Sequence, residues 1–534
     1  MFGKKKRILR AIRSQWGQTI VRKRDFDLIS SFHKIRNYSN DFIVDDTTWS
    51  DLSMDELFTR MDRTVSPIGS QYLYHMLHKY EFDRDKLKKR FNIYQFYINN
   101  QDYRESIQVI LKNLERRNAY YLSDLLFNKI PDRPKHYSIF YLLSITSIIC
   151  IAVLFFYPPI IFFAFIVFIT NLIVENRFNR KISSYITDLS VLSEMLRSAN
   201  KFAKLETKVK QIENLKSLKD ISNKLLKKIG WLTIDKTQLD ELSAMLIDYL
   251  NHFCLFNLCA FVRAIHFLKQ YRLELQTIFE TIGSLDAEIA MASYLEENKK
   301  HCVPSFNKSK SIQLKNIFHP LLENPIANSL KLKNNSCLVT GSNMAGKTTF
   351  IKTMGINVIL ALTLGFAHAE KMDVPQLIVH STIKRSDDLS EHKSYYFKEI
   401  EAILDFINLN KESHEHLFLI DEIFRGTNTV ERISAATSVL KYLARQSFIF
   451  VTTHDIELQE LLKDTFEMYH FSEQVENGNF YFDYKIKKGP CSNRNAIKLL
   501  ELKGYPDEIT SQAMEISKTI FTYVDLKGDN DPNS

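Results

Sequence analysis

A glycine-rich loop in the last third of the chain constrains the fold more than any other feature. Residues Gly341–Thr349 read GSNMAGKTT and match the phosphate-loop pattern G-x-x-x-x-G-K-[ST] in full. The apolar run Cys337–Val339 before it predicts a strand, and Phe350–Leu364 after it predicts a helix. A chance glycine-rich turn is the alternative, but the order of strand, loop and helix favours a loop that holds phosphate.

The residue types of this loop predict a site for ATP and magnesium. Glycines let the backbone N–H groups point inward at phosphate oxygens, and the following helix adds positive potential. We expect Lys347 to reach the β- and γ-phosphates and the Thr348 hydroxyl to bind Mg²⁺. The expected phosphate-binding set is Gly341, Ser342, Asn343, Met344, Ala345, Gly346, Lys347, Thr348 and Thr349.

Two later apolar runs place polar residues at predicted strand ends. Leu417–Ile420 leads into Asp421 and Glu422, and sites of open α/β sheets lie at such carboxyl ends. Neighbouring side chains on a strand point apart, so we expect Asp421 to hold Mg²⁺ and Glu422 to polarise the attacking water. The run Ser447–Thr453 ends at His454, which we expect to sense the γ-phosphate; an incidental histidine is the alternative. The predicted catalytic set is Lys347, Glu422 and His454, in an ABC-type ATPase.

The residues around these strand ends resemble those of the MutS mismatch-repair ATPase family. Thr340–Thr348 is similar to the family's T-G-P-N-M-x-G-K-S, whose N-M pair is unusual among phosphate loops. Asp421–Thr429 resembles D-E-x-G-R-G-T-S-T, with Phe424 where the family has glycine. Thr452–His454 matches the family's switch, and Asn316–Leu321 is similar to its R-H-P entry to the ATPase domain. Asn328 falls at the family's later asparagine.

The resemblance implies a homodimer in which ATP is bound between two subunits. Ser394 is then the position that contacts the γ-phosphate of the partner's ATP. Residues 489–525 resemble the family's terminal helix-turn-helix dimerisation element, while Arg63–Leu73 and Ser284–Ala290 resemble the two ends of its core and lever helices. The aromatic residue that holds adenine is not evident from the pattern.

An apolar run in the first half predicts a membrane hairpin at 138–174. The stretch 137–174 contains 38 residues without a charged side chain. One helix of that length would measure about 57 Å, almost twice a hydrocarbon core of about 30 Å. Pro158 and Pro159 divide it into Ser138–Tyr157 and Ile160–Val174. A buried soluble helical hairpin is the alternative, and the second segment is short enough to be re-entrant.

Positive charges flank both outer ends of the hairpin. They are Arg133, Lys135, Arg177, Arg180 and Lys181. By the positive-inside rule both ends lie in the cytoplasm. We therefore expect a multi-pass membrane protein with two spans, whose termini and ATPase domain are cytoplasmic.

The predicted fold class is α plus α/β, because a chain of 534 residues exceeds one ordinary core. A basic N-terminal arm at 1–44 carries nine Lys or Arg in its first 24 residues and no acid. Such an arm can meet DNA phosphates or anionic lipid, or remain solvated. The other predicted parts are a MutS-like helical core and lever domain at 45–310 interrupted by the hairpin, a phosphate-loop ATPase domain with a mixed sheet flanked by helices at 311–488, a helix-turn-helix at 489–525 and a disordered tail at 526–534.

Two functions remain open at this point. The first is a membrane-tethered, MutS-like ATPase that binds mismatched, damaged or branched DNA by its structure and moves helical levers. The second is a membrane-bound ABC-type ATPase switch that acts on a protein or lipid partner without DNA. Residues 1–44 are too few for the family's mismatch-reading domains, which favours the second. A transporter is disfavoured, since two spans form no translocation path and the L-S-G-G-Q signature is absent.

Overall fold

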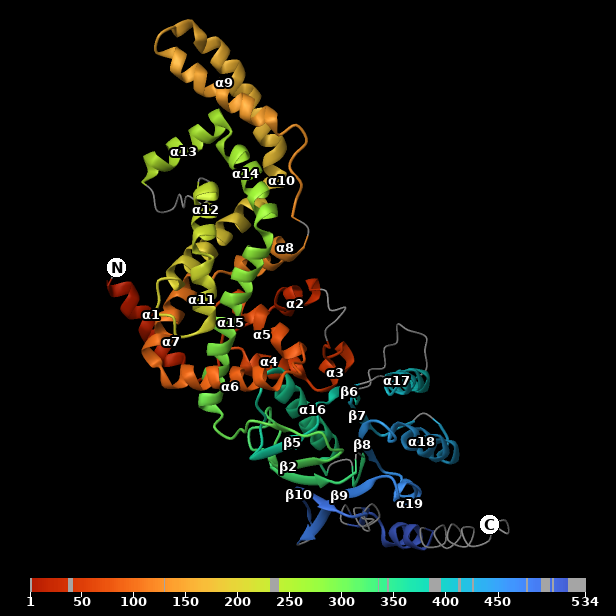
Figure 1. Cartoon of the computed structure of the whole chain (residues 1–534). Helices are drawn as coiled ribbons and strands as arrows, with labels where there is room; N and C mark the ends of the chain where they lie inside the picture. Colours follow the sequence, from red (N-terminus) through yellow and green to blue (C-terminus); the bar gives the residue numbers. More distant parts are fainter. Residues whose placement is uncertain are drawn as a thin grey trace. The chain divides into compact units, whose positions relative to one another are not determined.

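The computed structural model divides into two compact units. It describes residues 2–36, 42–128, 130–230, 240–334, 336–342, 345–383, 395–411, 414–424, 427–476, 479–490, 500–501 and 504–516. Unit 1 comprises residues 1–41, 58–79 and 89–299, and unit 2 comprises 42–57, 80–88 and 300–534. Figure 1 labels the helices and strands of the chain.

Unit 1 is built from helices. Its elements are α1 (Phe2–Gln15), α2 (Phe26–Ile35), α5 (Pro67–His78), α7 (Gln101–Leu111), η1 (Lys112–Leu114), η2 (Arg117–Tyr121), α8 (Leu122–Phe127), α9 (Ser138–Leu154), η3 (Pro158–Ile160), α10 (Ile161–Phe202), α11 (Lys210–Ser217), α12 (Lys219–Ile229), α13 (Glu241–Cys254), α14 (Phe256–Gln270) and α15 (Arg272–Glu297). Helices α4 (Met54–Met61) and α6 (Arg84–Asn99) include residues of both units.

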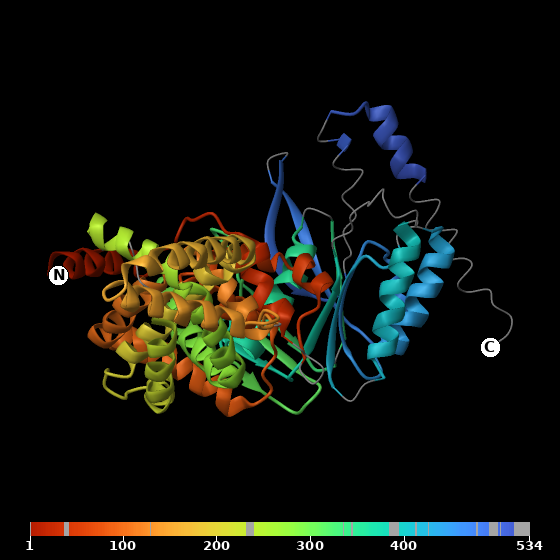
Figure 2. The ribbon, with the colours of Figure 1, turned by 90° about the horizontal axis from the view of Figure 1, so that it is seen from above.

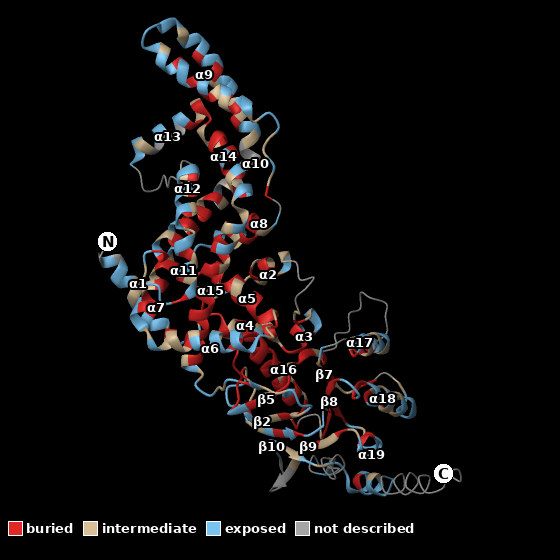
Figure 3. Ribbon diagram, viewed as in Figure 1, coloured by how far each residue is buried: buried red, intermediate tan, exposed pale blue. Residues whose placement is uncertain are grey.

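The core of unit 1 forms where α5 packs against α15. Ser66 caps α5 by accepting a hydrogen bond from the Gly69 N–H, and Pro67 supplies a first helical residue with a pre-set φ. Every residue of α5 except Tyr72 is buried. Figure 3 shows the corresponding buried band along α5 and α15. The stretches predicted to resemble the core and lever helices are therefore packed together within one unit.

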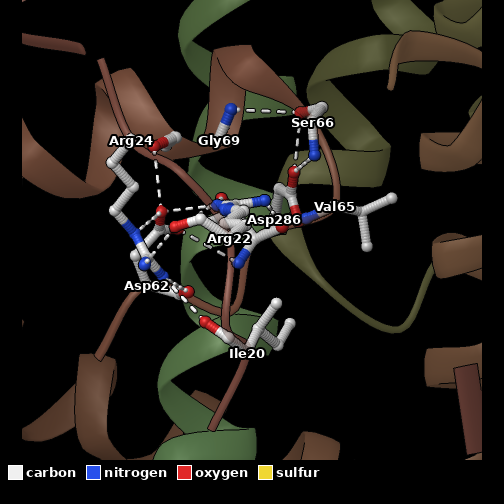
Figure 4. Close-up of polar contacts among 10 residues, drawn as sticks. Ile20, Arg22, Arg24, Asp62, Val65, Ser66, Gly69 and Asp286 are labelled. Carbon is white, nitrogen blue, oxygen red and sulfur yellow. Dashed lines mark hydrogen bonds and ion pairs between the residues drawn. The ribbon is translucent and has the colours of Figure 1, made fainter. Parts of the chain in front are cut away.

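Two buried carboxylates fix the loop before α5 (Figure 4). Asp286 of α15 accepts hydrogen bonds from the backbone N–H groups of Val65 and Ser66, at 2.9 and 2.7 Å. Asp62 pairs with Arg22 at 2.5 Å and with Arg24 at 3.2 Å. Burial opposes the ionisation of Asp62, but its arginine partners hold its pKa below the usual range. Burial raises the pKa of Asp286 to about 6.

These ion pairs change the interpretation of the basic arm. Arg22 and Arg24 belong to the nine positive charges predicted to meet phosphates, yet both are bound to Asp62. Residues 2–15 form a helix, and Arg13 within it pairs with Glu105 at 2.8 Å. Part of the arm's positive charge is thus used inside unit 1 rather than presented to a polyanion.

The apolar run forms a helical hairpin of α9 and α10, joined by a turn at Pro158–Ile160 (Figure 1). Among the described residues, Pro158–Phe178 alone is a single helix long and apolar enough to cross a membrane; the bent pair α13 and α14 passes the same test jointly. Helix α9 has 17 residues and is shorter. The second predicted segment, Ile160–Val174, is part of a longer helix, because α10 contains no proline or glycine and continues for 42 residues. Two full spans are therefore not shown.

Unit 2 contains two sheets. Its strands are β1 (Ser305–Phe306), β2 (Ile312–Ile317), β3 (Asn328–Leu332), β4 (Ser336–Thr340), β5 (Lys371–Val374), β6 (Ile378–Thr382), β7 (His416–Asp421), β8 (Phe448–Thr453), β9 (Glu467–Glu476) and β10 (Asn479–Lys488). Its helices are α3 (Asp46–Asp51), α16 (Lys347–Thr363), α17 (Tyr395–Leu409), α18 (Thr429–Leu443) and α19 (Glu457–Leu462). The sheet orders are β1-β5-β2-β3 and β10-β9-β4-β8-β7-β6.

The larger sheet is mixed, as predicted, and is covered on both faces. Strands β9, β4, β8, β7 and β6 are parallel, and β10 runs antiparallel to β9. Phe418 and Ile420 of β7 join the core under α17 and α18. Leu419, on the opposite face, approaches Gly355 of α16. Figure 2 shows α17 and α18 together on one side of this sheet.

Residues 42–57 belong to unit 2, although the predicted boundary of the ATPase domain is residue 311. The side chain of Asp51 accepts hydrogen bonds from the Ser381 hydroxyl and the Ile383 N–H, each at 2.7 Å. The Thr48 hydroxyl accepts from the Ser381 N–H at 3.0 Å. Helix α3 therefore covers β6, the edge strand of the larger sheet, which would otherwise present unpaired backbone groups.

We predict that Gly69→Ala destabilises unit 1. A Cβ at Gly69 would lie 2.3 Å from Asp286 Oδ2. This oxygen accepts hydrogen bonds from the N–H and the hydroxyl of Ser66, while Oδ1 accepts one from the Val65 N–H, so the carboxylate cannot easily move. Overpacking of this kind costs about 1–3 kcal/mol. Urea unfolding of the full chain in detergent, followed by circular dichroism, should show a lower midpoint. Gly3→Ala is the matched control, because nothing lies within 4 Å of the added Cβ. Equal midpoints for both variants would contradict the account.

Candidate phosphate-loop site

Three parallel strands bring the predicted site residues to one edge of the larger sheet. Strand β8 pairs with both β4 and β7, and Thr452 lies opposite Val339 on one side and opposite Asp421 on the other. Since all three strands run the same way, their carboxyl ends coincide. The phosphate loop, the adjacent carboxylates and the histidine switch therefore lie together, as the spacing of the motifs predicts.

Lys347 begins α16 and is buried, with 2% of its surface exposed. Its ammonium group donates to the carbonyl oxygens of Gly341 and Ser342 at 2.7 and 3.0 Å, and lies 3.2 Å from Nε2 of His454. A buried ammonium ion needs such partners. Gly346, the residue before it, has φ of +102°, which is in the region that favours glycine. Gly341 and Ser342, at the start of the loop, thus hold this positive charge.

Asp421 joins the loop to the neighbouring strand. Its Oδ2 accepts a hydrogen bond from the Thr348 hydroxyl at 2.9 Å, and its Oδ1 accepts one from the Thr452 hydroxyl. The carboxylate therefore bridges α16 and β8 from the end of β7. Hydroxyl and carboxylate oxygens are the ligands that Mg²⁺ prefers, so this oxygen pair fits the predicted metal position.

Glu422 and His454 form a second pair beside the first. Glu422 Oε1 lies 2.8 Å from His454 Nε2, and the Glu422 N–H donates to the Thr452 carbonyl at 3.1 Å. The backbone of Glu422 has φ of +60°, an uncommon conformation for a residue with a Cβ. Such strain persists only where surrounding contacts enforce it. Glu422 therefore lies just beyond the end of β7, where its carboxylate is paired with His454.

Phe424 occupies the position where the resembling motif has glycine. Its φ is +59°, which explains why glycine suits this turn. The ring is 5% exposed and lies 6.2 Å from the ring of Tyr396 in the core under α17 and α18. Its backbone N–H donates to the buried carboxylate of Glu399. Packing of the aromatic ring therefore offsets the unfavourable backbone conformation.

An ion pair that the sequence reasoning missed supports the switch strand. Arg432 of α18 binds Asp455 through two hydrogen bonds, of 3.0 and 2.6 Å. Asp455 directly follows His454, so the pair ties the end of β8 to α18. Asn428 caps the same helix by accepting from the Glu431 N–H at 3.0 Å. The sequence shows a helix cap at Asn428 and an arginine, Arg432, in the first turn of the helix. Only the fold brings Asp455 to Arg432.

A cavity of about 400 Å³ opens beside the phosphate loop. Its lining is mainly apolar and comes from the β2–β3 connection, the start of α16, β9 and β10. The residues are Ile317, His319, Leu322, Asn324, Pro325, Ile326, Asn328, Gly346, Thr348, Thr349, Phe350, Thr353, Phe471 and Tyr484. Burial lowers the pKa of His319 to about 4, so its ring is neutral near pH 7.

The sequence pattern missed Tyr484, one of the aromatic residues of this cavity. Tyr484 lies on β10, and a Cβ added to Gly346 would meet its ring at 3.3 Å. Asn328 accepts from the Ile486 N–H at 2.8 Å and donates to the Tyr484 carbonyl at 3.0 Å. Asn328 therefore holds β10 against the cavity. Because 156 residues separate Asn328 from Tyr484, no local motif connects them.

Several predicted site residues lie outside the described residues. They are Asn343 and Met344 of the loop, Ser394, and Arg425 and Gly426 of the motif after β7. In the predicted helix-turn-helix, the described part includes a helix at 507–516, which follows Pro506. The partner contact of Ser394 and the dimerisation role of this element remain expectations.

Comparison with known proteins identifies the domain. Residues 337–521 match MutS domain V, which is an ATPase domain. The chain is 31% identical over 274 residues to the DNA mismatch repair protein MutS of Lactobacillus acidophilus, covering 49% of this chain and 32% of that protein. For the MutS of Thermus thermophilus the identity is 30% over 200 residues, covering 36% and 24%. For that of Clostridioides difficile it is 27% over 279 residues, covering 49% and 29%. The chain thus spans about a third or less of these relatives.

We predict that Phe424→Gly lowers stability despite the positive φ. Removing a buried Phe side chain costs about 3–5 kcal/mol of stability. Glycine at this left-handed position avoids a backbone cost of only about 1–2 kcal/mol. Urea unfolding followed by tyrosine and tryptophan fluorescence should show the loss. Phe424→Leu is the matched control, since it keeps the Cβ and most of the apolar volume and should lose less. A Phe424→Gly variant as stable as the parent would show that the ring contributes nothing.

Proposed function

Starting from the MutS domain V of residues 337–521, we propose that the chain is a Mg²⁺-dependent ATPase that works as a membrane-attached homodimer. The observation that carries the proposal is the convergence of Lys347, Thr348, Asp421, Glu422 and His454 at one sheet edge. A loop-bound ammonium group, an oxygen pair and a carboxylate paired with histidine supply the parts that phosphoryl transfer needs.

Each residue has a distinct task in this proposal. Lys347 exchanges its loop carbonyls for phosphate oxygens, which it can do without a change of fold. Thr348 and Asp421 hold Mg²⁺, which when bound neutralises charge on the β- and γ-phosphates. Glu422 orients the attacking water and accepts its proton, while His454 holds the Glu422 carboxylate in place at 2.8 Å. The adenine base enters the cavity lined by His319 and Tyr484.

Two parts of the proposal rest on the resemblance. Ser394 contacts the γ-phosphate of the partner's ATP, and residues 489–525 hold the dimer together. The MutS proteins that match this chain are named for DNA mismatch repair. DNA binding by this chain would then rely on phosphate contacts and DNA shape, and would depend strongly on salt.

Exposed apolar side chains support membrane attachment. Leu142, Phe162 and Phe156 of the hairpin are 64%, 78% and 90% exposed. Figure 3 shows that most of α9 and the first part of α10 are exposed. A contiguous apolar surface of this kind marks a membrane or protein contact. The second candidate function, an ATPase switch that acts on a lipid or protein partner without DNA, draws its support from this surface.

We predict that two substitutions in the phosphate-loop site impair different properties, one ATP binding and the other ATP hydrolysis. Lys347→Ala should abolish ATP binding, because it removes the buried positive charge that faces the phosphates. Glu422→Gln should retain ATP but lose turnover by about 10²-fold or more, the range expected when a general base is removed. Equilibrium binding and phosphate release measure the two properties. Normal hydrolysis by Glu422→Gln would refute its assignment as the catalytic carboxylate.

An ATPase assay across a panel of DNA structures separates the two candidate functions. The full chain, in nanodiscs, is assayed with homoduplex, mismatched and branched DNA and with no DNA. Stimulation by one DNA class at moderate salt supports the DNA-binding function. Hydrolysis that ignores DNA but responds to lipid composition or to a co-purifying protein supports the switch. Failure of the purified chain to float with vesicles would refute membrane attachment under either function.

A further inference from the structure

We propose that the α9–α10 hairpin enters the bilayer from one side only and turns within the hydrocarbon, while α13 lies in the interface of the same leaflet. This inference rests on the membrane attachment proposed above. It replaces the expected two spans with a re-entrant hairpin and adds a second lipid-contacting element, α13.

The tip of the hairpin has the apolar composition expected of a turn that lies in hydrocarbon. Phe155, Phe156 and Tyr157 are 82%, 90% and 59% exposed, and Phe162 just beyond the turn is 78% exposed. No charged residue occurs between His136 and Glu175. A hairpin that crossed the membrane twice would hold these rings in water on the far side. Hydrocarbon around the tip removes that cost, which is about 25 cal/mol per Å² of apolar surface.

The backbone N–H groups of the tip need no water. Phe156 and Tyr157 donate to the Val153 carbonyl at 2.9 and 2.8 Å, and Ile160 donates to the Tyr157 carbonyl at 3.2 Å. Pro158 and Pro159 have no N–H to satisfy. An irregular turn in hydrocarbon is costly chiefly through unpaired backbone groups, and the N–H groups of this turn are paired or missing.

Polar contacts between α10 and α13 fix the position of α13 along the hairpin. Asn171 is fully buried, and its Nδ2 donates to the Phe253 carbonyl and, at 2.9 Å, to the Ser147 hydroxyl. Glu175 Oε2 lies 2.6 Å from His252 Nδ1. The ring of Phe253 stacks on Phe168 at 5.7 Å. The carboxyl end of α13 is therefore anchored beside residues 168–175 of α10.

Helix α13 carries an apolar stripe that continues the surface of the hairpin. Its members recur at helical spacing and end at Phe253, which packs against the hairpin residues Cys150, Ala164 and Val167. The exposed members are Leu242, Met245, Leu246, Tyr249 and Leu250, at 71%, 54%, 55%, 56% and 40%. A bend of 77° separates α13 from α14. An amphipathic helix with such a stripe is suited to lie in the plane of an interface.

The part of the hairpin that extends beyond Asn171 is too short to cross the bilayer. From Asn171 to Pro158 the chain advances 13 residues, or about 20 Å as a helix, against a hydrocarbon core of about 30 Å. Asp240 caps α13 through Ser243, and the adjacent Glu241 is exposed, so that end of the helix needs water or headgroups. If α13 lies in the interface, the aromatic tip reaches a little past the bilayer centre.

Depth-dependent fluorescence quenching tests this arrangement. Full-length Tyr157→Trp and Leu246→Trp are reconstituted into phosphatidylcholine vesicles with bromine either near the headgroup or near the end of the acyl chain. The signal of the parent protein, which has three native tryptophans, is subtracted. We expect Tyr157→Trp to be quenched more by the deep bromine and Leu246→Trp more by the shallow one. Leu273→Trp is the control, because Leu273 is 75% exposed but lies outside this surface on α15.

The outcomes test the re-entrant hairpin and the placement of α13 separately from membrane attachment itself. Stronger quenching of Tyr157→Trp by the shallow bromine would place the tip at the far interface and overturn the re-entrant hairpin, leaving attachment intact. Leu246→Trp quenched no more than Leu273→Trp would overturn the placement of α13. If Leu246→Trp instead shows self-association, the stripe is an interface between copies. Loss of vesicle binding by the parent protein would overturn membrane attachment itself.

Discussion

The hydrogen bond from the Thr348 hydroxyl to Asp421 is the contact on which the phosphate-loop site depends. It joins the first residues of α16 to the end of β7, while the Thr452 hydroxyl joins the same carboxylate to β8. Three segments, separated along the chain by 73 and 31 residues, are thereby held at one oxygen-rich point. Lys347 and the Glu422–His454 pair take their positions from the same strand ends. Without this bridge, the motifs would lie near one another but would not form a defined site.

Much of this site could be predicted from sequence because its motifs end strands that pair in parallel. Lys347, Thr348, Asp421, Glu422 and His454 lie together as expected. The cavity beside them could not be predicted, since its walls come from segments separated by more than 150 residues and no local spacing identifies Tyr484 as part of it. The Arg432–Asp455 pair was missed for the same reason. Local patterns predict strand ends, whereas the partners of side chains depend on tertiary packing.

The helical unit was predicted less completely. An uncharged run indicates helices and a turn at Pro158 and Pro159, both of which are present. It does not indicate how far each helix continues, and α10 extends through charged sequence to Phe202. The predicted basic arm fails in part because charge counting cannot foresee buried partners such as Asp62 for Arg22 and Arg24. Likewise, α3 covers the edge strand β6 of a sheet encoded some 330 residues later.

The central claim is that Asp421 and Thr348 form a magnesium position within an ATP-hydrolysing site. The most direct measurement compares ATP binding and hydrolysis by the parent chain and Asp421→Asn, each with Mg²⁺ and with excess EDTA. The account predicts that Mg²⁺ strengthens binding and starts hydrolysis in the parent, and that Asp421→Asn still binds ATP in EDTA but gains neither effect from Mg²⁺. An Asp421→Asn variant with the full magnesium response of the parent would contradict it.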